Sequence, residues 1–371
     1  MSHSGNKKIL YIVQHRQNRA PGQRYRCEQY IPYLKQAGFE CTYSPIIIKR
    51  EEEDSLYRSR SLWDKGMIFL KAFFRRVKDV IRARQYDIVF IYREAMPTGS
   101  VFFEKMLKKS GAKVILDFDD AVWLPSVSAV NKSLQWLKKP DKINKIIGLS
   151  NLVITGNSYL ADYAKKFNQA IKVFPSTIDL DYYKIPAQQI KEDDDKIIIG
   201  WSGSHTTIEH FNIIVPVLKK LKEKYGNKLE FIVYGDAGYK NDLLDIKSIA
   251  WSPDSEVEII SSFNIGIMPL PDNEWSKGKC SMKGLQYMGL AIPAVLADVG
   301  MNKEVVKDGV NGFLAKNEQE WLDKLQKLIE NKYLRQSIGL AGRETIEKEY
   351  SCQARNKEYV NIFLELSGQK Q

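Results

Sequence analysis

The turn after the apolar run 197–201 has the small residues of a phosphate-binding loop. Gly203 and Ser204 follow this predicted strand and precede a helix predicted over 208–225. Gly203 would let a phosphate approach the backbone, and the first N–H groups of the helix would donate to it. Thr206 and Glu209 have the spacing of a capping box. We therefore expect a diphosphate seat here, although a Gly-Ser turn before a helix is also a common connection and matches no dinucleotide or P-loop pattern.

A second loop brings lysines to the start of another predicted helix. Lys279 and Lys283 follow the predicted strand 265–270 and flank the start of the helix predicted over 282–288. Lys279 could neutralise a leaving diphosphate, and Lys283, one turn further, could assist. The alternative is that both lysines are solvated on an exposed loop.

The first half carries two further groups of polar residues after its strands. Asp117, Asp119 and Asp120 follow the apolar run 114–116, and carboxylates at a strand end are costly unless they are paired, exposed or used. We expect something to bind there, and the Asp-x-Asp spacing could suggest a metal.

Several arginines lie around Gly22, just after the first predicted strand. Arg24 and Arg26 are the nearest, and Arg16 and Arg19 precede them. Guanidinium groups in such a loop could grip an acceptor phosphate through paired hydrogen bonds, which makes Gly22, Arg24 and Arg26 the expected acceptor contacts. The alternative is that some of the arginines merely cap or pair with nearby carboxylates.

Strands alternate with helices through both halves of the chain. This rhythm predicts two parallel sheets covered by helices on both faces, with ligands bound at the carboxyl ends of the strands. The predicted domains are 1–180, completed by a C-terminal helix at 351–367, and 197–350, joined by a polar linker at 181–196. The expected elements are strands at 9–13, 41–48, 88–92, 114–117, 152–155, 197–201, 229–234, 265–270 and 294–296, with helices at 25–37, 68–84, 100–109, 208–225, 282–288, 318–330 and 332–348.

The order of these elements resembles family 4 of the glycosyltransferases, which are retaining enzymes of GT-B fold. The resemblance is strong over 197–352 and weaker in the first half. Its motifs are Gly200-Trp201-Ser202-Gly203-Ser204, Tyr234-Gly235, the loop at Trp251, Gly266-Ile267-Met268-Pro269-Leu270, Gly278-Lys279, Gly309-Val310-Asn311-Gly312-Phe313, Pro21-Gly22-Gln23-Arg24-Tyr25-Arg26 and Asp117-Phe118-Asp119-Asp120-Ala121. It implies two Rossmann-like domains facing each other across a cleft, with an acceptor-binding first domain and a nucleotide-sugar-binding second domain.

The resemblance also implies roles for single residues. Trp251 and Ser252 would lie beside the nucleobase, and Tyr234 and Gly235 would line the nucleotide cleft. Asp119 or Asp120 would position the acceptor; with the donor motifs in the second half, neither a metal nor another cofactor is expected. Transfer in this family is pictured as front-face attack in which the leaving diphosphate accepts the acceptor's proton.

The chain departs from the family at one motif. Many members carry two glutamates eight positions apart, where this chain has Gly278 and Gln286. Gln286 can still hydrogen-bond a ribose hydroxyl. Gly278 cannot contact the sugar through a side chain, and we expect Lys279, in the Gly-Lys-Cys sequence, to take over part of that work.

The net charge of +11 is concentrated in the first half of the chain. Residues 1–190 contain 32 Lys and Arg against 18 Asp and Glu, a net charge of +14, and the remainder carries −3. Such a surface could attract nucleic acid, anionic lipid or a phosphate-bearing substrate. No nucleic-acid-binding module is visible, so nucleic acid is not an expected partner.

A predicted basic helix at 63–84 offers a possible membrane contact. Its apolar residues would share one face among lysines and arginines, and we expect this face to pack on the first sheet, with peripheral contact to anionic membrane as the alternative. The apolar residues are Phe69, Phe73, Val77, Val80 and Ile81. No run of 18 apolar residues occurs, and the four dispersed cysteines suggest neither a zinc site nor disulfides. We expect a cytoplasmic protein, with the inner face of the cell membrane as the alternative location.

Together these features predict a retaining glycosyltransferase of bacterial surface polysaccharide or glycoconjugate synthesis. It would transfer a hexose-type sugar from a nucleoside diphosphate to a glycan or lipid-linked glycan. The alternative is a GT-B-shaped binding or regulatory protein that has lost catalysis, because both motif glutamates are missing.

Overall fold

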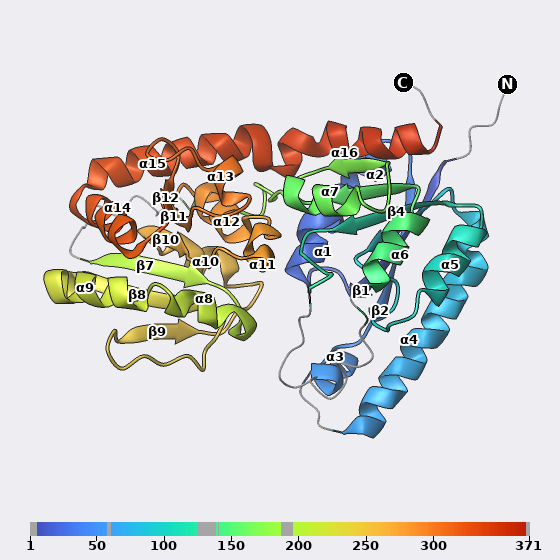
Figure 1. The fold of residues 1–371 in the computed structure, drawn as a ribbon, viewed down its shortest axis with the longest axis horizontal. Coiled ribbons are helices and arrows are strands. Elements are labelled where there is room, and N and C mark those ends of the chain that lie inside the picture. The colour runs from blue at the N-terminus through green and yellow to red at the C-terminus, as the bar shows by residue number, and fades with distance from the viewer. Residues whose placement is uncertain (1–5, 58–60, 125–138, 140, 187–195, 369–371) are drawn as a thin grey trace. The chain divides into compact units, whose positions relative to one another are not determined.

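The computed structural model describes residues 6–57, 61–124, 139, 141–186 and 196–368. The chain divides into two compact units (Figure 1), unit 1 with Met1–Pro175 and Asn356–Gln371, and unit 2 with Ser176–Arg355. Most of the predicted linker at 181–196 lies outside the described residues. Within the described ranges, no helix combines the length and the hydropathy of a membrane span.

Unit 1 contains a parallel six-stranded sheet in the order β2-β1-β3-β4-β5-β6. Residues Ile9 to Val13 of the first strand are fully buried, as expected for a strand covered on both faces. The short strand β6 was not predicted. The strands are β1 (Lys8–His15), β2 (Glu40–Ile47), β3 (Ile88–Tyr92), β4 (Lys113–Phe118), β5 (Leu152–Thr155) and β6 (Ile171–Val173).

The helices of unit 1 connect these strands, and the end of α16 returns to the same unit. Tyr359 and Phe363 of α16 are fully buried in unit 1, where Tyr359 stacks on Tyr30 with ring centroids 4.0 Å apart. The helices are α1 (Pro21–Arg26), the 3-10 turn η1 (Glu28–Tyr30), α2 (Ile31–Gln36), α3 (Arg50–Tyr57), α4 (Leu62–Arg82), η2 (Ala83–Gln85), α5 (Phe102–Lys109), α6 (Lys142–Leu149), α7 (Ser158–Ala164) and α16 (Cys352–Leu366).

Unit 2 repeats the architecture with a parallel sheet in the order β12-β11-β10-β7-β8-β9. Because β7 lies between β10 and β8, the turns after these three strands meet at one edge of the sheet. β9 and β12 were not predicted. The strands are β7 (Ile197–Ser202), β8 (Leu229–Tyr234), β9 (Ile246–Ile249), β10 (Ile265–Met268), β11 (Ala294–Ala297) and β12 (Phe313–Ala315).

The single helix predicted over 208–225 is interrupted. A three-residue 3-10 turn and two helices take its place, and Pro216 lies in the first turn of the second helix. The helices of unit 2 are η4 (His205–Thr207), α8 (Ile208–Asn212), α9 (Val215–Tyr225), η5 (Gly226–Lys228), α10 (Glu256–Ser261), α11 (Glu274–Lys277), α12 (Met282–Gly289), α13 (Asn302–Val305), α14 (Glu318–Glu330), α15 (Lys332–Thr345) and the π-helix η6 (Ile346–Tyr350).

Helix α4 packs on unit 1 through a different face from the predicted one. Its buried side chains are Ile68, Ala72, Arg76 and Asp79, whereas Phe69 and Ile81 of the predicted core face are exposed. Arg76, which the sequence pattern places among the basic surface residues, is fully buried.

Arg76 is held by four acceptors, one on α4 itself and three from other parts of the unit. It donates to Asp79 at 2.7 Å, to the carbonyl of Ser44 at 3.0 Å, and to the carbonyls of Val13 and Ala95. A buried guanidinium needs this satisfaction because desolvating an unpaired charge costs several kcal/mol. The arginine therefore fastens α4 to β1, β2 and the segment after β3.

We expect Arg76→Met to destabilise the protein by about 3–5 kcal/mol, because Asp79 and three backbone carbonyls lose a buried donor. Urea unfolding at neutral pH should show a lower midpoint for this variant. The control is Lys78→Met on the exposed side of the same helix, which should stay within about 0.5 kcal/mol of the wild type. Equal midpoints for the two variants would contradict the assigned role.

Candidate functional site

Two glycines bring the turns after β7 and β8 into direct contact. The backbone N–H of Gly203 donates to the carbonyl of Tyr234 at 2.8 Å. Gly235 has a φ of +120°, and a Cβ there would lie 2.0 Å from the carbonyl oxygen of Gly203. Any side chain at Gly235 would therefore push the turns apart. His205 and Asp236 also connect the two turns, with 3.0 Å between Nδ1 and Oδ2.

The expected capping box in this turn is not formed. Ser204 precedes the 3-10 turn η4, and its hydroxyl lies 2.8 Å from that of Thr206 instead of capping a helix. The α8 helix begins only at Ile208 and has five residues, so the dipole of a long helix does not act on Gly203 and Ser204. Any anion selectivity at this edge must come mainly from side chains.

Three cationic or titratable side chains lie at this edge. Lys279 and Lys283 are half-buried, with their Nζ atoms 4.5 Å from the Trp275 ring and 5.5 Å from the Trp201 ring. His210 of α8 is buried beside them. Burial first, then Lys283 and Lys279, lower the pKa of His210, while Glu209 opposes the shift. His210 is thus a neutral neighbour of two lysines, and the sequence analysis missed it.

Residues 276–283, which run from the end of α11 to the first turn of α12 and are called the lysine loop below, have strained backbone and unsatisfied polar atoms. Ser281, directly before α12, has a φ of +55°, which is uncommon for a residue other than glycine. The hydroxyls of Ser276 and Ser281 are buried and have no hydrogen-bond partner among the described residues. Buried unsatisfied hydroxyls in a strained lysine loop are typical of a site that a polar ligand completes.

Among the remaining predicted donor residues, Tyr234 holds a loop in place and Trp251 is presented by that loop. Tyr234 is buried, and its hydroxyl donates to the carbonyl of Ser252 at 2.8 Å and accepts from the Ser252 N–H at 3.1 Å. It therefore fixes the loop that presents Trp251. The Trp251 indole is half-buried and donates to Glu256 at 3.3 Å.

Glu256 joins the predicted base-binding and ribose-binding residues into one network. Its Oε1 accepts from Trp251 and from the amide of Gln286 at 3.0 Å, and its Oε2 accepts from Tyr182. The Gln286 amide also donates to the hydroxyl of Tyr183 at 2.7 Å. A ribose contact by Gln286 would thus have to use its carbonyl oxygen. Nothing in the sequence spacing pointed to Glu256.

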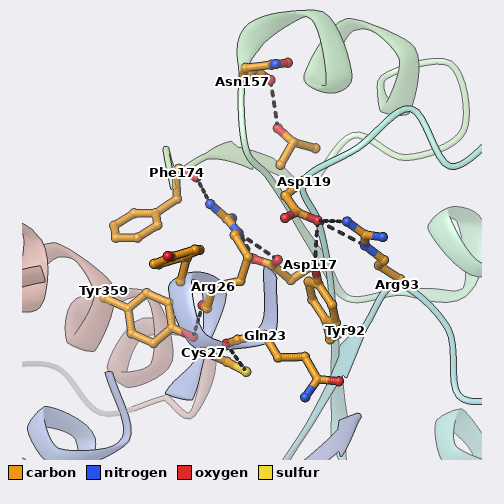
Figure 2. Close-up of polar contacts among 12 residues, drawn as sticks. Gln23, Arg26, Cys27, Tyr92, Arg93, Asp117, Asp119, Asn157, Phe174 and Tyr359 are labelled. Carbon is orange, nitrogen blue, oxygen red and sulfur yellow. Dashed lines mark hydrogen bonds and ion pairs between the residues drawn. The ribbon is translucent and has the colours of Figure 1, made fainter. Parts of the chain in front are cut away.

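In unit 1, the predicted acceptor residue Arg26 forms a buried ion pair (Figure 2). Its Nε and NH2 groups donate to the two oxygens of Asp117 at 2.9 and 2.7 Å, and NH1 donates to the carbonyl of Phe174. Both side chains are inaccessible to solvent. Burial raises the pKa of Asp117, and Arg26 opposes that rise. The expectation that Arg26 grips an acceptor is wrong, because its donors serve Asp117 and the backbone.

Arg93 pairs with the two other carboxylates at this edge, and Figure 2 shows its bonds to Asp119. It donates to Asp119 Oδ1 from Nε at 3.0 Å and from NH2 at 2.6 Å, and to Asp120 at 2.6 Å. Tyr92 adds a hydrogen bond to Asp119 at 2.8 Å. Burial alone would raise the pKa of Asp119, but Arg93 and Arg26 hold it below its ordinary value. Asp119 is therefore an anion at neutral pH.

Gly22 lies directly against Tyr92 and Asp119. A Cβ at Gly22 would be 2.0 Å from the Tyr92 hydroxyl and 3.1 Å from Asp119 Oδ2. The structure thus brings Gly22 to Asp119, while the half-buried Arg24 donates to the hydroxyl of Tyr25. Sequence reasoning missed Arg93, although its place directly after an apolar strand was an available signal. Its φ of +63°, which only the structure shows, is uncommon for a residue other than glycine.

The loop after β1 brings His15 close to three arginines. Arg16 and Arg19 both pair with Glu53. Burial, followed by Arg19, Arg16 and Arg93 and opposed by Glu53, lowers the pKa of His15 to about 4. The imidazole is therefore neutral in the folded protein at physiological pH, where its free pKa would be about 6.5.

We expect His15 to make folding stability dependent on pH. A lowered pKa means that the unfolded state binds the proton more readily, so stability is lost as pH falls from about 6.5 towards about 4. His15→Gln should lose less stability than the wild type between pH 7 and pH 4.5 in urea melts. Comparison at pH 8, where both proteins are neutral at this position, corrects for packing. Parallel pH profiles would contradict the shift.

Residues 196–331 match the family model described as Glycosyl transferases group 1. A curated relative, the capsular polysaccharide biosynthesis glycosyltransferase CapM of Staphylococcus aureus, is 24% identical over 191 residues. That match covers 47% of this chain and 47% of the relative, so it spans about half the length of CapM.

Solved glycosyltransferase structures resemble the whole chain. Sucrose-phosphate synthase from Thermosynechococcus elongatus has a TM-score of 0.67 at 12% identity, covering 98% of this chain and 99% of that one. Anabaena HepE, solved with UDP-glucose, has a TM-score of 0.65 at 13% identity, covering 96% and 99%. The predicted fold class is confirmed. The comparisons therefore support a glycosyl transferase group 1 domain at residues 196–331, in a chain whose two parallel sheets have the GT-B fold.

Proposed function

We propose that the protein is a retaining glycosyltransferase that uses a nucleoside-diphosphate sugar as donor. The observation that carries this proposal is the lysine loop of unit 2, which combines Lys279 and Lys283 with two buried serine hydroxyls that have no hydrogen-bond partner in the described part of the chain. This loop lies inside the segment that matches the glycosyltransferase family. The UDP and UDP-glucose complexes of HepE, a protein of the same fold, support this class of ligand.

The diphosphate would lie between the glycine turn and the lysine loop. Gly203 and Gly235 let the turns after β7 and β8 pack directly together, and Ser204 is exposed beside them. Charge-assisted hydrogen bonds from Lys279 and Lys283 would compensate the phosphate charge. Trp251 and Ser252 would contact the base, while the carbonyl oxygen of Gln286 would accept from a ribose hydroxyl.

In the reaction, the bond between the anomeric carbon and the diphosphate oxygen breaks, and a bond to the acceptor oxygen forms on the same face. The acceptor hydroxyl gives its proton to the leaving diphosphate, so the protein does not need a separate base. Lys279 stabilises the negative charge that develops on the diphosphate. This assignment makes Lys279 a catalytic residue in addition to a binding residue.

Unit 1 would supply the acceptor contacts. Asp119 is anionic and is held rigidly by Arg93 and Tyr92, so it can accept a hydrogen bond from an acceptor hydroxyl in a fixed direction. Gly22 packs closely against Tyr92 and Asp119, where a Cβ would clash, and Asp120 and Arg24 are partly accessible. We assign these residues to acceptor positioning. The name of the relative CapM supports an acceptor of surface polysaccharide synthesis, free or lipid-linked.

The loss of the two motif glutamates favours a second candidate, a GT-B protein that binds nucleotide without catalysis. Gly278 offers no side chain to a donor sugar, and Gln286 is neutral. However, the buried carboxylate of Glu256 lies 3.0 Å from the Gln286 amide, so an acidic group is still present at this position in space. Release of free sugar from a nucleotide-sugar in the absence of acceptor would exclude the non-catalytic candidate.

We expect one nucleoside diphosphate among UDP, GDP, ADP and dTDP to stabilise the protein in thermal-shift assays. A ligand at about 100 times its Kd contributes roughly 2.7 kcal/mol of stability. Calorimetric titration should then show weaker binding by Lys279→Ala and Lys283→Ala, by about tenfold or more, because each loses a charge-assisted hydrogen bond.

The matched control is Lys277→Ala, which removes an exposed lysine of the same loop that pairs with Asp272. It should bind nucleotide like the wild type. The proposal fails if none of the nucleotides stabilises the wild type, or if all three lysine variants bind alike. NMR of the product anomer would test retention separately.

A further inference from the structure

The outward face of α4 carries a row of exposed apolar side chains. Trp63 is 78% exposed, Phe74 61% and Ile81 63%, and Met67 and Leu70 are also exposed. We name these five residues the outer stripe. Exposed apolar residues scattered singly are ordinary, but five on one helix form a patch that indicates an interaction site.

The outer stripe lies opposite the face that packs on unit 1. With 100° between successive residues of a helix, the stripe residues cluster within about 60°, and the buried residues Ile68, Ala72, Arg76 and Asp79 cluster about 180° away. The spacing of the stripe, 63, 67, 70, 74 and 81, follows the helical period. The usual arrangement of an amphipathic helix is therefore partly inverted. The buried face includes the Arg76–Asp79 ion pair, and the solvent-facing side carries aromatic and aliphatic side chains.

The exposed charged residues of α4 and of the neighbouring α5 are mostly positive. Lys71 and Lys78 flank the outer stripe, and Lys105 and Lys109 are exposed on α5. These four lysines form no ion pair among the described residues. Of the acidic residues on the two helices, Asp79 and Glu104 are buried, which leaves Asp64. Figure 1 shows α4 along the outside of unit 1 with α5 beside it.

We infer that the outer stripe docks on an anionic lipid bilayer. Apolar side chains would enter the region between headgroups and acyl chains, where tryptophan is favoured, and the flanking lysines would reach phosphate headgroups. A second copy of this chain fits less well. Two stripes packed together would bring Lys71 and Lys78 of both copies to the same interface, with Asp64 as the sole exposed carboxylate of each α4.

The orientation of α4 links this surface to the acceptor site. The helix begins on the side of the sheet where β2 ends and finishes on the side where β3 begins. It is about 32 Å long, and β3 spans about 17 Å. The Trp63 end therefore extends past the carboxyl edge that holds Asp119 and Arg93. If the protein is the proposed transferase, docking would bring that edge towards lipid-linked acceptors. This consequence rests on the proposed function, whereas the docking inference is argued from the surface of α4.

Flotation with vesicles tests the inference. The full-length wild type should float with vesicles of phosphatidylcholine containing about 30% phosphatidylglycerol at low salt, and much less with pure phosphatidylcholine or at high salt. The double variant Trp63→Ser/Phe74→Ser should lose at least tenfold in partitioning. Lys71→Gln/Lys78→Gln should lose the preference for anionic vesicles, by roughly fivefold for each lysine.

The matched control is Leu340→Ser, which removes a side chain of similar exposure from α15 in unit 2. It should float like the wild type, and all variants should keep the wild-type circular dichroism. The inference is overturned if the wild type does not float with anionic vesicles, or if the stripe variants float as much as the wild type. A wild-type dimer in light scattering that the stripe variants abolish, without vesicle binding, would assign the face to a second copy instead. The stripe variants should bind nucleotide like the wild type. A failure of membrane docking can then be told apart from a failure of the proposed transferase function.

Discussion

The structure of unit 1 depends on the buried ion pair between Arg26 and Asp117. A guanidinium and a carboxylate without solvent are tolerated only when their hydrogen bonds are satisfied, and here two bonds join them while a third reaches the Phe174 carbonyl. The pair connects α1 to β4 and to the end of β6. The Tyr359 hydroxyl donates to the Arg26 carbonyl at 3.2 Å, so α16 is attached to the same point.

This constraint determines which side chains remain for an acceptor. With Asp117 neutralised by Arg26, Asp119 and Asp120 depend on Arg93, whose left-handed backbone directs its guanidinium to both carboxylates. Charge balance alone therefore does not require a ligand at this edge. What favours one is that the side chains of Arg93 and Asp120 stay partly exposed. Gly22 adds no space there, because a Cβ at this position would lie 2.0 Å from the Tyr92 hydroxyl.

Most strands could be predicted from the sequence because buried parallel strands are continuous apolar runs, as at 9–13 and 197–201. The short edge strands β6, β9 and β12 could not, because a run of three or four residues, broken by a lysine in β6 and β9, is too short to show a strand pattern. Pro216 was an available signal for the break between α8 and α9. Arg26 and Arg76 were misplaced on the surface because the sequence does not show which arginine has a buried carboxylate nearby. Asp117 and Arg26 are 91 residues apart, and only the topology brings them together.

The distribution of charge also becomes intelligible once these pairs are known. The excess of +14 in residues 1–190 and, separately, the arginines around Gly22 both suggested anion binding. Arg16, Arg19 and Arg26 are instead paired with carboxylates, as is Arg93. Exposed lysines of α4 and α5 contribute to the uncompensated charge. They lie beside apolar side chains that a folded domain would ordinarily bury. Where positive charge and exposed aromatic residues occur on the same helix, an anionic apolar surface satisfies both, which neither water nor a soluble phosphate can do.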